Sequence, residues 1–173
     1  MSNGMLWLLG GVLLAQSSSP YTGEEKREIK ALSQEDAHGL ATGAGMGMAR
    51  AAELNGFPGP KHVLELAEAI ELTEEQRRGV NEVFGRMNAR AVELGEAVIE
   101  SERALDTGFA ARTLDAEGLR HATAELAALR GELRYVHLVA HLETTALLES
   151  RQIEAYTRLR GYGSGDHHGR RHH

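Results

Sequence analysis

The chain has 173 residues, a length that suits one domain, and 42% of them are hydrophobic whereas only 5% are aromatic. Leu, Ala and Val must therefore form most of any core, as is usual in helical bundles. The formal net charge of -6 offers no general attraction to nucleic acid, so no nucleic-acid partner is expected. Cysteine is absent, which excludes disulfides, thiol chemistry and a lipid on an N-terminal cysteine.

The first structural feature along the chain is an apolar run at residues 5–15 (MLWLLGGVLLA). It is too short to span a bilayer as a helix, which needs about 20 residues, but it has the length of a signal-peptide core. Small residues follow at Ala15, Ser17 and Ser18, although no Lys or Arg precedes the run. We therefore predict that residues 1–18 are a signal peptide cleaved near Ala15 to Ser18; a weak membrane anchor, or a true start upstream, is the alternative.

Short helices are expected between this segment and residue 72. We predict a charged helix from Tyr21 to Ala31 and a helix start at Ser33–Asp36, followed by glycine-rich breaks. Gly56–Pro60 has the composition of a turn, and Pro60 can open a helix from Lys61 to Glu71. The apolar positions on one face of that helix are Val63, Leu64, Ala67 and Ile70.

A capping box opens the first of two long helices. The Thr73 hydroxyl can cap free N–H groups, the Gln76 side chain can reach back three residues, and Glu74 and Glu75 suit the positive end of the helix dipole. We predict a helix from Thr73 to Phe109. Its apolar residues recur at alternating spacings of four and three, as in a coiled-coil seam: Val80, Phe84, Met87, Ala91, Leu94, Val98 and Leu105.

The second long helix repeats this rule after a turn at Gly108 and Ala110 to Asp115. Its seam comprises Leu119, Ala122, Leu126, Leu129, Leu133, Val136, Ala140 and Leu147. The two seams predict an antiparallel hairpin. A weaker copy of the capping box at Leu148–Gln152 begins a last helix, from about Ser150 to Arg160, and residues 163–173 are expected to be a disordered, His-rich tail.

Four apolar residues lie outside these seams: Val92, Ile99, Leu138 and Leu142. From Tyr135 to Leu148 the second helix is apolar almost all round, so it must be covered on more than one side. The cover could be the preceding short helices, a second subunit or a bound client. We therefore predict that the four residues form a client or dimer surface.

No catalytic signature is present, and we expect no enzyme. The sequence lacks a Cys nucleophile, a G-x-S-x-G elbow, a phosphate loop and an H-E-x-x-H pair. A di-iron bundle needs two Glu-x-x-His motifs, but only Glu35–His38 has that spacing.

Histidine is abundant, with nine in the chain. His137 and His141 are one helical turn apart and face the same way, a spacing that lets two imidazoles bind one Zn, Ni, Co or Cu ion. His62 is the favoured third ligand, with Glu65 or Glu68 behind it. The alternative is that His137 and His141 are boundary residues with ordinary hydrogen bonds.

Other candidate metal ligands are separate from this pair. The tail histidines would collect borderline metals loosely: His167, His168, His172 and His173. Met46 and Met48 could bind soft Cu(I), but at that spacing in a Gly-rich stretch ordinary packing is the favoured interpretation.

Together these motifs resemble the LTxxQ-motif family of Gram-negative periplasmic proteins, which includes Spy/CpxP-like stress chaperones, zinc-resistance-associated proteins and CnrX-type heavy-metal sensors. The resemblance covers residues 20–162 and is carried by three segments: Leu72–Gln76, Leu148–Gln152 and Ala155–Tyr162. The segment from Ala52 to Leu64 resembles a subgroup described as heavy-metal-resistance proteins.

The resemblance implies a periplasmic location, a hooked all-α hairpin over residues 19–162, a cradle-shaped homodimer and no catalysis. Sensor members bind metal through His and signal to a membrane-bound partner, and by position His137 and His141 match their ligand pair. Chaperone members hold unfolding envelope proteins without ATP. Two departures are Glu149, where the family has Thr, and the acidic charge balance.

Two functional hypotheses follow. The first is a periplasmic metal-responsive binding or sensor protein of the envelope-stress or heavy-metal response. The second is an ATP-independent chaperone that holds unfolded proteins on its apolar surface. A third interpretation is an interaction module without a ligand.

Overall fold

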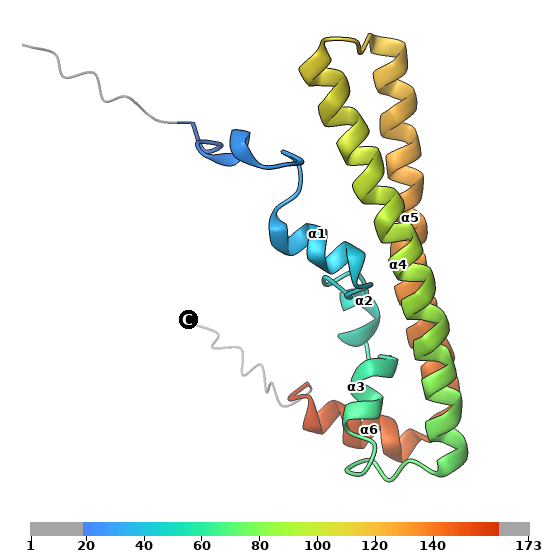
Figure 1. The fold of residues 1–173 in the computed structure, drawn as a ribbon. Coiled ribbons are helices and arrows are strands. Elements are labelled where there is room, and N and C mark those ends of the chain that lie inside the picture. Colours follow the sequence, from blue (N-terminus) through green and yellow to red (C-terminus); the bar gives the residue numbers. More distant parts are fainter. Residues whose placement is uncertain (1–18, 163–173) are drawn as a thin grey trace, which may run out of the picture.

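The computed structural model describes residues 19–162, and every regular element in that range is helical. The elements are a short 3-10 helix η1 (Glu24–Lys26), α1 (Gln34–Ala41), α2 (Arg50–Glu53), α3 (Pro60–Glu65), α4 (Glu74–Ala111), α5 (Ala116–Ala146) and α6 (Ser150–Leu159). The predicted all-helical class and packed long helix pair are confirmed (Figure 1). The predicted signal peptide or anchor and the predicted tail lie outside the described residues.

The caps set the limits of the long helices much as predicted. Thr73 Oγ1 accepts a hydrogen bond from the Gln76 N–H at 3.1 Å, and Gln76 Oε1 accepts one from the Thr73 N–H at 3.0 Å. Helix α4 ends where Arg112 adopts a left-handed conformation with φ 57°, and Asp115 caps α5 by accepting from the Gly118 N–H at 2.8 Å. The turn therefore lies at residues 112–115, because α4 continues through Gly108.

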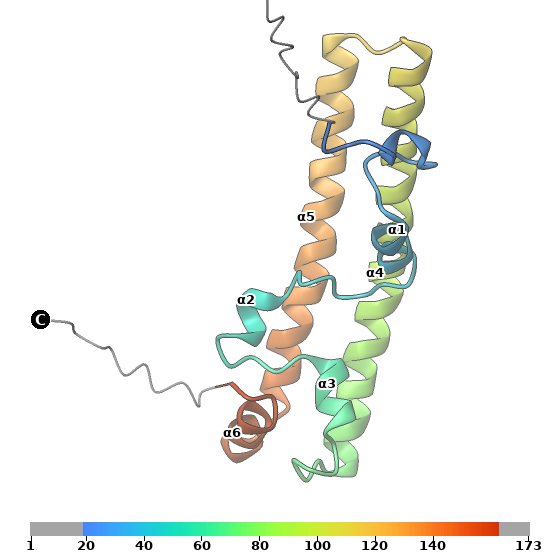
Figure 2. The same ribbon diagram turned by 90° about the vertical axis from the view of Figure 1, so that its left-hand side faces the viewer.

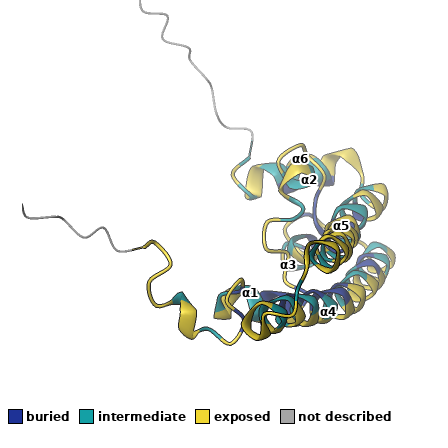
Figure 3. Cartoon of the chain, turned by 90° about the horizontal axis from the view of Figure 1, so that it is seen from above, coloured by how far each residue is buried: buried dark blue, intermediate teal, exposed yellow. Residues whose placement is uncertain are grey.

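The short helices all lie on one side of the long pair. Helix α1 packs on α4, α2 packs on α5, and α3 contacts both (Figures 1 and 2). Seen from above, the outer faces of the long pair are largely exposed, and buried residues are concentrated between the long pair and the short helices (Figure 3). Within residues 19–162, every helix is too short or too polar to cross a membrane.

Two clusters form the core. The larger one lies midway along the long pair and contains Ile29, Leu32, Leu40, Ala91, Leu94, Val98 and Leu133. Helix α1 approaches α4 so closely there that a Cβ at Gly95 would overlap the Leu40 carbonyl, so this position requires glycine. The smaller cluster joins α3, α4 and α6 and contains Val63, Ile70, Val80 and Tyr156.

The predicted seams are buried only in part. Val80, Ala91, Leu94, Val98, Leu133 and Ala140 are buried, whereas Leu147 is 37% exposed. Phe84 and Met87 are half-buried because they line a cavity between α4 and the segment that precedes α2.

Two predicted helices are shorter than expected. Only Glu24–Lys26 is helical in the segment Tyr21 to Ala31, because Gly23 is left-handed (φ 94°) and Arg27 is extended (ψ 147°). Helix α3 stops at Glu65, and turns with irregular hydrogen-bond spacings continue to Glu71. The face predicted to be apolar is nevertheless buried at Val63, Ala67 and Ile70.

The two capping boxes meet in space through their glutamines. Gln76 Nε2 donates to Gln152 Oε1 at 2.8 Å, and Gln152 Nε2 donates to Gln76 Oε1 at 2.9 Å. Gln152 Oε1 also accepts from the Glu149 N–H at 2.8 Å, and Gln76 Nε2 also donates to the Leu147 carbonyl at 2.9 Å. This amide pair therefore joins the start of α4, the end of α5 and the start of α6.

Candidate functional site

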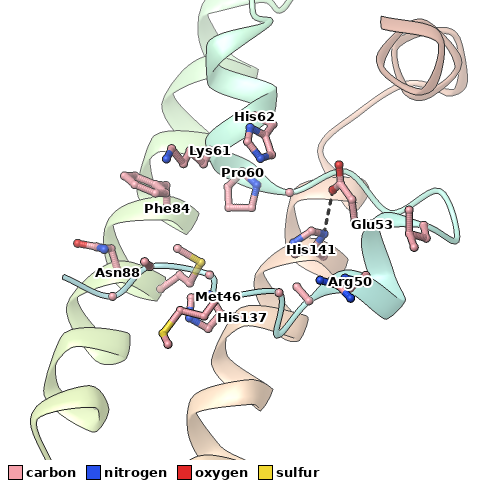
Figure 4. A pocket seen from close by; sticks show the side chains of 18 of the residues that line it. Met46, Arg50, Glu53, Pro60, Lys61, His62, Phe84, Asn88, His137 and His141 are labelled. Atoms are coloured by element: carbon pink, nitrogen blue, oxygen red, sulfur yellow. Dashed lines mark ion pairs between the residues drawn. The ribbon is translucent and has the colours of Figure 1, made fainter. Parts of the chain in front are cut away.

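A cavity of about 700 Å³ lies between the short helices and the long pair. Its walls are the glycine-rich segment 42–47, α2, the start of α3, and the facing sides of α4 and α5. All three histidines of the predicted site, His62, His137 and His141, line it (Figure 4). The volume is that of a typical small-molecule or cofactor pocket.

His137 is buried in this wall without a partner for one of its ring nitrogens. The side chain is 3% exposed, and Nε2 has no hydrogen-bond partner. Burial lowers the pKa of the imidazole, and the nearby His141 lowers it further. The ring is therefore neutral near pH 7, which is the form that binds a metal ion.

His141, one turn further along α5, is oriented by the backbone. Its Nδ1 donates to the Phe57 carbonyl at 2.7 Å, and a carbonyl can only accept, so Nδ1 carries the hydrogen. A Cβ at Gly59 would overlap the ring, so the glycine allows the chain to pass over it. A backbone acceptor at one ring nitrogen is the usual arrangement of a metal-binding histidine, because it leaves the other nitrogen unprotonated.

Glu53, which sequence reasoning missed, connects this wall to the last helix. Its Oε1 accepts from the Tyr156 hydroxyl at 2.6 Å and lies 3.4 Å from Arg160 Nε. Its Oε2 has no hydrogen-bond partner and lies 3.8 Å from His141 Nδ1, as the dashed line in Figure 4 marks. Burial, followed by the contact with Glu53, raises the pKa of Tyr156. Nothing in the sequence places Glu53 and Tyr156 together.

His62 reaches the cavity but is not placed as a third ligand. Its Nδ1 pairs with Glu65 Oε2 at 2.7 Å, a contact that lowers the pKa of Glu65. Glu68 instead pairs with Arg77 at 2.6 Å. In the described part of the chain, no three His, Cys, Asp or Glu side chains are grouped closely enough to hold a metal ion.

The other predicted ligands lie in two places. Met46 is 43% exposed and lines the cavity with a left-handed backbone (φ 45°), whereas Met48 packs against the larger core cluster. The four tail histidines lie outside residues 19–162.

The predicted client or dimer surface is not one uniform patch. Ile99 packs against the larger core cluster, and Val92 and Leu138 are half-buried. Leu142 is 55% exposed and Tyr135, on the same helix, is 59% exposed.

Comparisons of this chain with protein-family models, with curated proteins and with solved structures found no match.

Proposed function

We propose that this protein is a metal-responsive binding protein whose site is built on His137 and His141. The observation that carries the proposal is the pair of imidazoles on successive turns of α5: one is oriented by the Phe57 carbonyl, and the other is neutral with an unpartnered Nε2. Neutral imidazole nitrogens bind Zn, Ni, Co and Cu, so these metals are the proposed ligands.

The resemblance to the LTxxQ-motif family extends this proposal. It supports a periplasmic location, a hooked hairpin, a homodimer and a membrane-bound signalling partner. The paired glutamines of the two capping boxes are consistent with the resemblance, since each box begins a helix and both boxes lie at one end of the long pair.

The metal proposal is tested in the full chain after the four tail histidines are replaced by Ala, which removes loose tail binding. Metal that binds only the folded state should raise the unfolding free energy by about 2.7 kcal/mol at a hundredfold excess over Kd. Melting temperature is measured with each metal in turn. His137→Ala/His141→Ala should abolish the shift, whereas the exposed His38→Ala/His121→Ala should preserve it. No shift with any metal, or an equal shift in both double variants, contradicts the proposal.

A second candidate function is an ATP-independent chaperone that holds unfolding proteins. The exposed Tyr135 and Leu142 on α5 favour it, because large apolar side chains exposed on one helix suit a protein-binding surface. Suppression of aggregation of an unfolding client is measured without metal. Tyr135→Ser/Leu142→Ser should weaken it, whereas Phe109→Ser, an equally exposed site at the other end of the long pair, should not. Full aggregation with the unaltered chain excludes this function.

A further inference from the structure

The cavity contains two imidazoles, of which His141 is oriented by a hydrogen bond, but residues 19–162 offer no third ligand of the kind that divalent metals prefer. No third His, Cys, Asp or Glu in residues 19–162 is close enough to complete a group of three. The thioether of Met46 also lines the cavity, but it suits soft Cu(I) rather than Zn²⁺, Ni²⁺ or Co²⁺. A divalent ion bound to His137 and His141 therefore needs at least one further ligand from outside residues 19–162.

The charged side chains around the same cavity favour an anionic ligand. Three cationic side chains line it, Arg50, Lys61 and Arg160, against one carboxylate, Glu53, although the chain as a whole is acidic. Arg160 lies against Glu53, whereas neither Arg50 nor Lys61 forms an ion pair with any described residue. Arg50 comes from α2 and Lys61 from α3, so the two unpaired cations border the cavity from different elements (Figure 4).

This lining weakens the binding of a bare dication without preventing it, because like charges repel each other and the exposed Arg50 and Lys61 are screened by water. A small anion that enters with the metal removes the conflict. Guanidinium and ammonium groups both bind carboxylates through charge-assisted hydrogen bonds. The cavity is also far larger than a single metal ion requires.

We propose that the cavity binds a divalent transition metal together with a small organic dicarboxylate. One carboxylate completes the coordination begun by His137 and His141, and the other is held by Arg50 and Lys61. The charges of the metal and the dicarboxylate then cancel. This inference rests on the proposed metal-binding function, and it adds the class of the second ligand and the residues that select it.

The experiment uses the full chain with the four tail histidines replaced by Ala, Co²⁺ as the metal and radiolabelled malonate as the dicarboxylate. Equilibrium dialysis measures retained malonate, and the visible absorption of Co²⁺ reports its coordination. We expect about one malonate per chain in the presence of Co²⁺ and none in its absence, with a change in the Co²⁺ spectrum when malonate is added.

Two matched variants test the cationic residues. Arg50→Gln/Lys61→Gln should weaken malonate retention by roughly tenfold or more, because it removes both charged partners of one carboxylate. Lys26→Gln/Arg120→Gln removes the same charge at exposed positions outside the cavity and should leave retention unchanged.

The outcomes separate this inference from the proposed function. Binding of Co²⁺ without retention of malonate overturns the inference and leaves the metal site standing. Equal retention of malonate with and without Co²⁺, or equal losses in the two double variants, also overturns it. Absence of Co²⁺ binding under both conditions overturns the inference and the proposed function together.

Discussion

At the end where α4 begins and α5 ends, here named the covered end, short helices lie against the long pair. At residues 112–115, here named the bare end, the long pair extends beyond the short helices (Figure 1). At the covered end the seam residues Val80 and Ala140 are buried. At the bare end Leu105 and Leu119 are only half-buried. A two-helix seam therefore buries its apolar residues fully only where a third element closes over it.

The covered end also holds the unsatisfied polar groups. Within residues 19–162, the buried side-chain atoms without a hydrogen-bond partner belong to Glu53, Arg77, His137, Thr144 and Arg160. None of these residues lies in the bare end. Buried unpaired polar atoms are costly and each needs an explanation, such as a bound water, an ion or a role in binding, and in residues 19–162 most of them belong to residues that line the candidate site.

The largest effect should come from truncating the same side chain at a covered position and at a bare position of α5. Leu133→Ala should lower the unfolding free energy by about 2–5 kcal/mol, because Leu133 is buried in the larger core cluster. Leu119→Ala, in the half-buried seam of the bare end, should lower the unfolding free energy by clearly less. Urea denaturation of both variants measures the difference, and equal losses would contradict the division into a covered and a bare end.

The next effect concerns the amide pair. Gln152→Ala removes the buried Gln152 amide and both its bonds to Gln76, and the Glu71 carbonyl and the Glu149 N–H lose this partner, so we expect a loss of about 1–3 kcal/mol. Gln34→Ala, at an exposed first position of α1, is the matched control and should change stability by less than about 0.5 kcal/mol. Thermal unfolding distinguishes the two variants.

A pH effect should distinguish two histidines of α5. Burial places the folded-state pKa of His137 below its ordinary value of 6.5. Below that pH the unfolded chain binds a proton at His137 that the folded chain does not, so the unfolding free energy falls as pH is lowered and is unaffected above it. The slope contributed is at most about 1.4 kcal/mol per pH unit.

Denaturation from pH 7.5 to 5 in the presence of a chelator measures this slope. His137→Gln should flatten it, whereas His121→Gln, at an exposed position near the bare end, should leave it as in the parent chain. A slope that survives in His137→Gln would show that another group causes the loss.

The smallest effect is expected from the ion pair that joins α4 and α5 beside the larger core cluster. Glu102 is buried and lies 2.7 Å from Arg130, whose side chain is half-exposed. The amide oxygen introduced by Glu102→Gln can still accept from Arg130, and water solvates the exposed part of Arg130, so the substitution should cost no more than about 1 kcal/mol. The cost should shrink further at high salt. A loss as large as that of Gln152→Ala would show that this ion pair stabilises the protein as strongly as the amide pair does.

Local patterns were sufficient to predict the long helices. The apolar spacing and the Thr73 capping box are local signals, and their chemistry needs no distant partner. The predicted helix at Tyr21 to Ala31 was wrong because charged residues alone did not reveal that Gly23 would be left-handed. The predicted length of α3 was wrong because regular helical hydrogen bonding stops at Glu65 and irregular turns continue to Glu71.

The candidate site was less accessible to sequence reasoning. The spacing of His137 and His141 placed both on one face of α5, and the cavity wall contains both. Arg50 and Glu53 were missed because their importance comes from α6 and from the cavity, and the contact between Glu53 and Tyr156 spans 103 residues. His62 lines the cavity together with His137 and His141, but its pairing with Glu65 depends on side-chain geometry that the sequence does not show.

The meeting of Gln76 and Gln152 also sets a rule for how this chain can change in length. Helix α4 begins at this glutamine pair and α5 ends at it. A heptad inserted into only one of the two helices would therefore move the two capping boxes about 10 Å apart along the helix axis. A heptad inserted into both helices would keep the glutamines together and only extend the arm. The bare end can therefore vary in length among descendants of this sequence, but only by equal steps in the two helices.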